Sequence, residues 1–232
     1  MILCLETATS LCSVALCDDN GVAASRESSD SKSHASLLTV FIGEVLAEKG
    51  LKASDLDAVA VSKGPGSYTG LRIGVSAAKG IAFAASVPLI GIETTFSMFY
   101  GMKEKDTFSP MENILYCPVL DARRMEVFYA IYNNDGINIK GIRAEIIDEN
   151  TFTDLTSNHH IIIFGDGAMK LKSVIRDPEI IIETGFRMSA SHLSKPALEA
   201  LKNRRFEDVA YFEPLYLKDF IATKPKKNIL GA

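Results

Sequence analysis

The apolar residues of this chain form short strand-like runs near its start and then a longer stretch with helical spacing. Ile2 to Leu5, Leu11 to Cys17 and Val22 to Arg26 are the strand-like runs. The Asn20-Gly21 pair that precedes the last run predicts a type I′ hairpin between the second and third strands. Apolar side chains then recur every three or four positions over residues 34–48, which predicts an amphipathic helix.

The stretch from Lys63 to Ala82 combines a glycine-rich turn with a predicted helix. A buried strand is predicted at Ala58 to Val61, and Gly64-Pro65-Gly66 then lets the backbone turn sharply. Ser67 is a candidate helix cap, and residues 68–85 have the spacing of a helix. The first part of the chain therefore has the predicted order βββαβα.

The predicted helix over 68–85 is unusual because polar residues occupy only one narrow stripe of its surface. Two interpretations fit: the helix lies deep inside one large domain, or it packs on its own domain and offers a second side to a partner. A ridge of small residues at every fourth position would let another backbone come close. The stripe is Tyr68, Arg72, Ser76 and Lys79, and the ridge is Gly70, Gly74, Ala78 and Ala82.

The second part of the chain repeats the first at an offset of 115 residues (120 − 5 = 115). Leu5-Glu6 falls on Leu120-Asp121, and Asn20-Gly21-Val22 falls on Asp135-Gly136-Ile137. Two βββαβα halves form the duplicated α/β architecture of the ribonuclease H-like, actin-like ATPases (ASKHA fold). We therefore expect two half-domains of this kind.

Composition and charge narrow the function classes. The chain has 232 residues and a formal net charge of −4, which argues against a protein that grips nucleic acid through its own basic face. No apolar run approaches the about 18 residues that a membrane span needs, so a cytoplasmic protein is expected. The four cysteines show no zinc or disulfide spacing and are expected in the core: Cys4, Cys12, Cys17 and Cys117.

The two turns that follow the first strand of each half would hold nucleotide phosphates in an actin-like ATPase. Neither Glu6-Thr7-Ala8-Thr9-Ser10 nor Asp121-Ala122-Arg123-Arg124 contains the glycine that lets backbone amides approach an anion. Glu6 would also repel a phosphate unless a metal ion intervened. Glu6 and Asp121 are interpreted as turn caps, with a paired-carboxylate catalyst as the alternative. The weak cofactor candidates are Glu6, Thr7, Asp121 and Arg123.

Other catalytic signatures are missing from the sequence. The glycine loop matches neither a Walker A nor a dinucleotide motif, and no G-x-S-x-G nucleophile elbow is present. His34 would need a second histidine at position 38 to form a metal pair on one helix face, and Leu38 stands there. We expect no metal site and no catalytic residue.

Several segments together resemble the bacterial TsaB (YeaZ) family, whose members help to make threonylcarbamoyladenosine next to the tRNA anticodon. The sequence departs from that family at two places, where Glu6-Thr7-Ala8 and His34-Ala35 replace Asp-Thr-Ser and His-Ser. The resemblance covers nearly the whole chain. Its segments are Ile2 to Thr9, His34 to Leu38, Lys63 to Ala82, Asp121 to Val127 and Pro214 to Leu217.

The resemblance implies a non-catalytic scaffold that binds the paralogous transferase TsaD as a heterodimer, with the ATPase TsaE at the junction. It implies a homodimer when TsaD is absent, contact with tRNA only through the complex, and no membrane association. No cofactor is expected on the chain itself, although ATP or ADP could lie at the junction. A nucleotide-dependent kinase or hydrolase of the actin-like class is the alternative function, and a glycoprotease-like peptidase is a second, less well supported one.

The predicted division is a first half over 1–102, a linker over 103–112, a second half over 113–222 and a basic tail over 223–232. A Gly74→Leu change is expected to block TsaD binding and leave the monomer folded, because it would fill the ridge. The predicted partner interface is His34, Leu37, Leu38, Phe41, Val45, Tyr68, Gly70, Leu71, Arg72, Gly74, Val75, Ala78 and Lys79.

Overall fold

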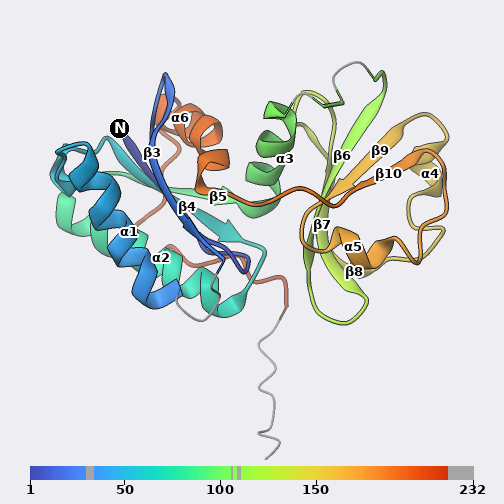
Figure 1. The fold of residues 1–232 in the computed structure, drawn as a ribbon, viewed down its shortest axis with the longest axis horizontal. Coiled ribbons are helices and arrows are strands. Elements are labelled where there is room, and N and C mark those ends of the chain that lie inside the picture. The colour runs from blue at the N-terminus through green and yellow to red at the C-terminus, as the bar shows by residue number, and fades with distance from the viewer. Residues whose placement is uncertain (30–33, 106, 109–110, 219–232) are drawn as a thin grey trace, which may run out of the picture.

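The computed structural model describes residues 1–29, 34–105, 107–108 and 111–218. It contains two five-stranded mixed sheets, one in each half of the molecule (Figure 1). The first sheet consists of β1 (Ile2–Glu6), β2 (Cys12–Asp18), β3 (Gly21–Ser28), β4 (Ala58–Gly64) and β5 (Leu89–Glu93). The second consists of β6 (Ile114–Asp121), β7 (Glu126–Tyr132), β8 (Asn138–Ile146), β9 (His160–Phe164) and β10 (Ile180–Glu183).

The two sheets have the same strand order, which confirms the predicted duplication. The first runs β3-β2-β1-β4-β5 and the second, read from its other edge, runs β8-β7-β6-β9-β10. The offset is 115 residues at the end of the first strand (121 − 6 = 115) and 114 at the end of the second (132 − 18 = 114). The difference arises because the second connection, residues 122–125, is one residue shorter than the first, residues 7–11. Strands β5 and β10 were not predicted.

Helices α1 (His34–Glu48) and α2 (Tyr68–Ala85) cover one face of the first sheet, side by side (Figure 1). Both helices match their predicted bounds. The α1 helix ends because Gly50 adopts a φ of +64° and Leu51 N donates to Leu46 O at 3.0 Å. The Ser67 hydroxyl accepts from Gly70 N at 3.2 Å, so the predicted α2 cap is confirmed.

The third helix of each half packs on the other half. Apolar side chains of α3 (Thr94–Glu104) enter the core of the second sheet, whereas the 3₁₀-helix Ala190–Leu193 and α6 (Ser194–Lys202) cover the free face of the first. The predicted linker start at residue 103 therefore lies inside α3. The predicted second half, residues 113–222, includes α6, which packs on the sheet of the first half. The exchanged side chains are Met98, Phe99 and Met102 from α3, and Ala190, Leu193, Ala197 and Ala200 from the later segment.

Residues 203–218, here called the C-terminal strap, return along the first half after α6. Leu215 N donates to Lys63 O at 2.6 Å, and Lys63 pairs with Glu207 at 3.3 Å. Residues 214–217 dock on the first half through the bond from Leu215 N and belong to no strand. Lys218 then pairs with Glu126 of β7, so the strap also touches the second half. The predicted tail over 223–232 lies outside the described residues.

The turn between β2 and β3 differs from the predicted type, whereas the cysteines lie where they were predicted. The β2–β3 loop is Asp19-Asn20, and positive φ at this turn is confined to Gly21 at +112°. A type I′ turn needs positive φ at both central residues, so that prediction was wrong. The four cysteines are free and buried, as predicted. In the part of the chain that the structure describes, no helix combines the length and apolar character needed to cross a bilayer.

Candidate functional site

The turn between β1 and β2 is closed by its own acidic residue. Glu6 is fully buried, and its Oε1 accepts from Ala8 N at 2.6 Å while Oε2 accepts from the Ser62 hydroxyl. Burial raises the pKa of Glu6 to about 7, although the Ser62 and Ala8 donors oppose the rise. The predicted capping role of Glu6 is confirmed, because both of its carboxylate oxygens accept hydrogen bonds from the chain.

The same turn packs against the first turns of α2. Thr7 is buried, and its hydroxyl donates to Gly70 O at 2.8 Å. A Cβ placed on Gly70 would lie within 3.0 Å of the Thr7 carbonyl oxygen, and one on Gly74 within 3.0 Å of Thr7 Oγ1. The ridge of small residues therefore lets the chain approach itself, not a partner. A Gly74→Leu monomer cannot keep this packing, which corrects the expectation stated above.

The equivalent turn between β6 and β7 is open to solvent. Asp121 Oδ1 accepts from Arg123 N at 2.7 Å and from Lys170 Nζ at 2.6 Å. Partial burial alone would raise the pKa of Asp121, but the bonds from Lys170 and Arg123 N hold it below its ordinary value. Asp121 is thus a cap, as predicted. Arg123 and Arg124 are exposed and hold positive φ values of +71° and +52°.

Three backbone amides of the two turns already have acceptors within the chain. Ala8 N donates to Glu6, Asp121 N to Asp166 Oδ1 at 3.0 Å, and Ala122 N to Glu126 O at 3.1 Å. The charge that faces Glu6 is Asp166, so the alternative Glu6–Asp121 carboxylate pair is not formed. Among the described residues, no group of three or more His, Cys, Asp or Glu side chains is placed to hold a metal ion.

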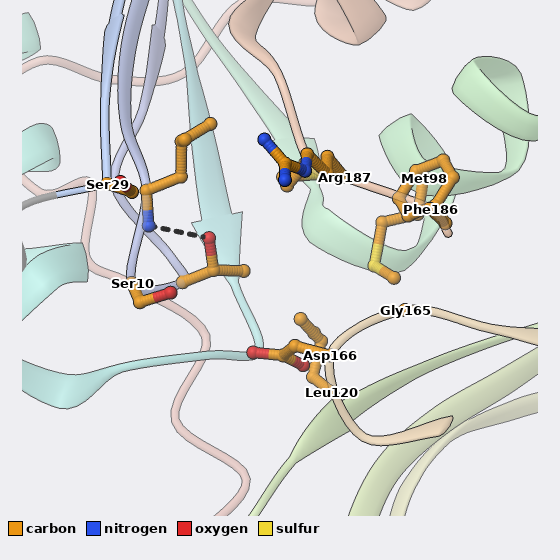
Figure 2. A pocket seen from close by; sticks show the side chains of 11 residues that line it. Ser10, Ser29, Met98, Leu120, Gly165, Asp166, Phe186 and Arg187 are labelled. Carbon is orange, nitrogen blue, oxygen red and sulfur yellow. Dashed lines mark hydrogen bonds between the residues drawn. The ribbon is translucent and has the colours of Figure 1, made fainter. Parts of the chain in front are cut away.

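A cavity of about 240 Å³ lies between the two halves, beside the first turn. Figure 2 shows Asp166 and Arg187 on opposite sides of it, with Ser10 near the turn and Phe186 and Met98 on the remaining wall. Gly165 holds a φ of +117° and brings Asp166 beside the end of β6. In the sequence only the stretch Gly165-Asp166-Gly167 marks this place, as a glycine turn after the apolar run 161–164, and nothing local marks Arg187.

The predicted partner residues divide into a buried and an accessible set. Leu37, Phe41, Tyr68, Arg72 and Lys79 are exposed or partly exposed, and the His34 side chain lies outside the description. The others face the chain's own core, because the helices turn these positions toward the sheet. The buried set is Leu38, Val45, Gly70, Leu71, Gly74, Val75 and Ala78.

The outward side of α1 and α2 is apolar and small, and sequence reasoning missed it. Val40 is 51% exposed and Phe83 is 79% exposed. Gly43 and Gly80 are exposed inside the helices, and a Cβ on either would have no neighbour within 4 Å. We call this surface the two-helix face. It consists of Ser36, Val40, Gly43 and Ala47 on α1 with Ser76, Gly80, Phe83 and Ala84 on α2.

The duplicated sheets and the two equivalent turns define an α/β protein of the actin-like, ribonuclease H-like class. A sequence profile described as "TsaD: tRNA N6-adenosine threonylcarbamoyltransferase" matches residues 22–211. The chain belongs to this family, and its full-length curated relatives carry the name TsaB.

Relatives of known name agree with that placement. The chain is 29% identical to "tRNA threonylcarbamoyladenosine biosynthesis protein TsaB" of Escherichia coli K12, over 96% of each chain. It is 25% identical to the Bacillus subtilis protein of the same name, over 94% of this chain and 93% of that one. A solved Pseudomonas aeruginosa structure described as similar to peptidase YeaZ superposes with a TM-score of 0.80 at 22% identity, covering 94% and 99% of the two chains.

Proposed function

We propose that this chain is a non-catalytic subunit of the machinery that forms threonylcarbamoyladenosine in tRNA, and that its two-helix face binds the transferase TsaD. The names of its full-length relatives support the pathway. The observation that carries the binding role is the pair Gly43 and Gly80, which are exposed glycines in helix interiors without any intrachain neighbour that requires them.

Glycine in a helix interior costs about 1 kcal/mol relative to alanine. At Gly70 and Gly74 the contact with Thr7 explains the glycine, because no Cβ fits. At Gly43 and Gly80 the chain itself gives no such reason. Small residues on an outward helix surface let a second pair of helices come close, and Val40 and Phe83 supply apolar area beside them.

Charged residues near the face are already engaged at its edges. Arg26 pairs with Glu44 and Glu48, both at 2.9 Å. Lys79 donates to two strap carbonyls, and the closer one is Phe212 O at 2.8 Å. The centre of the face is therefore suited to an uncharged partner surface with a polar rim. We expect a paralogue with the same fold to present such helices, which favours TsaD, or a second copy of this chain when TsaD is absent.

The larger assembly is part of the same proposal. TsaE would join at the junction with TsaD, any ATP or ADP would bind there, and tRNA would be contacted through the complex. The net charge of −4 supports this arrangement, because the chain has no excess of basic residues with which to bind phosphates alone.

The test is a Gly80→Leu variant mixed with TsaD from the same cell. Because nothing surrounds Gly80, the monomer is expected to melt at or above the wild-type temperature, whereas heterodimer formation falls at least about tenfold. Gly141→Leu is the matched control, since Gly141 is also exposed with an open Cβ position but lies in β8. Light scattering after size exclusion measures both complexes. Wild-type binding by Gly80→Leu would disprove the assigned face.

The actin-like kinase or hydrolase remains the competing hypothesis. The carboxylate-capped amides of both turns oppose it. Titration calorimetry of the isolated chain with ATP and magnesium separates the two hypotheses, because micromolar binding accompanied by turnover would replace the scaffold with an enzyme.

A further inference from the structure

The cavity between the halves is smaller than a nucleotide site. Its volume is about 240 Å³, below the about 300–1,000 Å³ of pockets that bury drug-sized ligands. Burial and then the Asp121 charge raise the pKa of Asp166, and the Asp166 charge contributes to the raised pKa of Glu6, so this side of the cavity is acidic. The small volume and the acidic side of the cavity disfavour a phosphate-rich ligand and favour a small molecule.

Two opposite charges face the cavity without meeting each other. Arg187 forms no hydrogen bond or ion pair with another residue in the described ranges 1–29, 34–105, 107–108 and 111–218. Among the described residues Asp166 accepts the Asp121 amide at 3.0 Å and forms no ion pair, although the Lys170 charge acts to lower its pKa. Burial in the cleft raises the pKa of Asp166, and the nearby Asp121 charge adds to the rise. A ligand that carries both a cation and an anion would complement this pair.

The remaining walls of the cavity are polar at one end and apolar at the other, so they would orient a bound ligand. Thr9 Oγ1 accepts from Leu11 N at 3.2 Å, which leaves its hydroxyl proton to donate into the cavity. Figure 2 shows Met98 and Phe186 together on the far wall, away from Ser10. An apolar branched group fits against them.

We propose that this cavity binds a free α-amino acid with a small branched side chain. The α-carboxylate lies on Arg187, where a guanidinium can hold both of its oxygens. The α-ammonium lies on Asp166, and the side chain contacts Met98 and Phe186. The proposal is independent of the proposed function, since it uses neither the two-helix face nor a partner.

Titration calorimetry of the full chain with L-valine and its isostere L-threonine tests the proposal. At least one is expected to bind with a Kd of about 1 mM or tighter. Isobutylamine lacks the carboxylate of valine and 3-methylbutanoate lacks its amine, so each is expected to bind at least about tenfold more weakly than valine. Absence of binding by both amino acids at about 10 mM, or equal binding of either analogue, overturns the proposal.

Charge-specific variants locate the ligand. Arg187→Gln is expected to weaken amino-acid binding at least about tenfold and to leave isobutylamine binding unchanged. Asp166→Asn keeps an oxygen for the Asp121 amide, and it should weaken the amino acid while sparing 3-methylbutanoate. Arg176→Gln is the control, because Arg176 is exposed and does not line the cavity. Wild-type affinity in both cavity variants, or displacement of the amino acid by phosphate, would contradict the assignment.

Discussion

The two halves share one sheet plan but differ in the helices that cover it. Between the third and fourth strands the first half carries α1, with 15 residues, where the second carries α4 (Thr153–Thr156), with 4. Between the fourth and fifth strands it carries α2, with 18 residues, where the second carries α5 (Ala168–Leu171), with 4. Duplication has kept the sheets and changed the helical layer. Long helices with an open outward side occur on the first half, which is where we place the partner.

The two equivalent turns also differ in how far the neighbouring helix covers them. Glu6 is sealed under α2, whereas Asp121, at the same place in the second half (6 + 115 = 121), has a side chain that is 52% exposed. The long α2 requires Gly70 and Gly74 to accommodate the first turn. The short α5 covers less, so Lys170 and the strained Arg123 and Arg124 hold the second turn at the surface.

The largest expected effect comes from filling the contact between α2 and the first turn. In Gly70→Leu the new Cβ would clash with the Thr7 carbonyl oxygen, which is backbone and cannot rotate away. The free energy of unfolding should fall by about 3 kcal/mol or more, as measured by urea denaturation. Gly80→Leu, on the outward side of the same helix, should lose nothing. Equal losses in both variants would show that the two sides of α2 are not distinct.

The next effect is a pH dependence with opposite signs in the two halves. Glu6 has a folded pKa of about 7 against an ordinary value of 4.5, so the folded state binds its proton more tightly. Stability from this group is full at low pH and is lost as pH rises between those values, by about 3 kcal/mol at most. Urea titrations at about pH 5 and about pH 8 measure the loss, and Glu6→Gln should remove it.

Asp121 supplies the internal comparison for that experiment. Its pKa is lowered, so its stabilising contribution is present above its ordinary value and is lost as pH falls through the folded value. Because its side chain is exposed, the effect should be far smaller than that of Glu6. If Glu6→Gln retained the wild-type slope between about pH 5 and about pH 8, the buried carboxyl would not be its source.

Local signals allowed much of the fold to be predicted, but not which side of α2 faces inward. Ser67 and the apolar spacing gave the bounds of α2 because caps and periodicity depend on neighbouring residues. Gly70 and Gly80 look alike in sequence, yet one contacts Thr7 and the other contacts nothing. Only the position of the β1–β2 turn separates them. The exchange of α3 and α6 between halves likewise has no local cause.

Local sequence predicts even less about which residues line the cavity between the halves. Asp166 follows β9, and Arg187 lies on the segment that returns to the first half after β10. Their separation in sequence gives no sign that both side chains line the same cavity. Gly165 carried a weak signal, since its positive φ is what turns the chain beside β6. Such sites depend on how the halves are joined, which local patterns do not encode.

The smallest expected effect concerns the exposed second turn. Arg124 holds a φ of +52°, which a residue with a Cβ adopts at a cost of about 1 kcal/mol and which glycine adopts freely. Arg124→Gly should raise the unfolding free energy by about 0.5 kcal/mol, because glycine also gains entropy in the unfolded chain and offsets part of the relief. The Lys170 bond to Arg124 O is a backbone contact and survives the change. Thermal melting at neutral pH measures the difference, with Arg176→Gly as the control for loss of an exposed arginine. A destabilised Arg124→Gly would mean that the guanidinium holds this turn, and the contrast between a packed first turn and a merely strained second one would then fail.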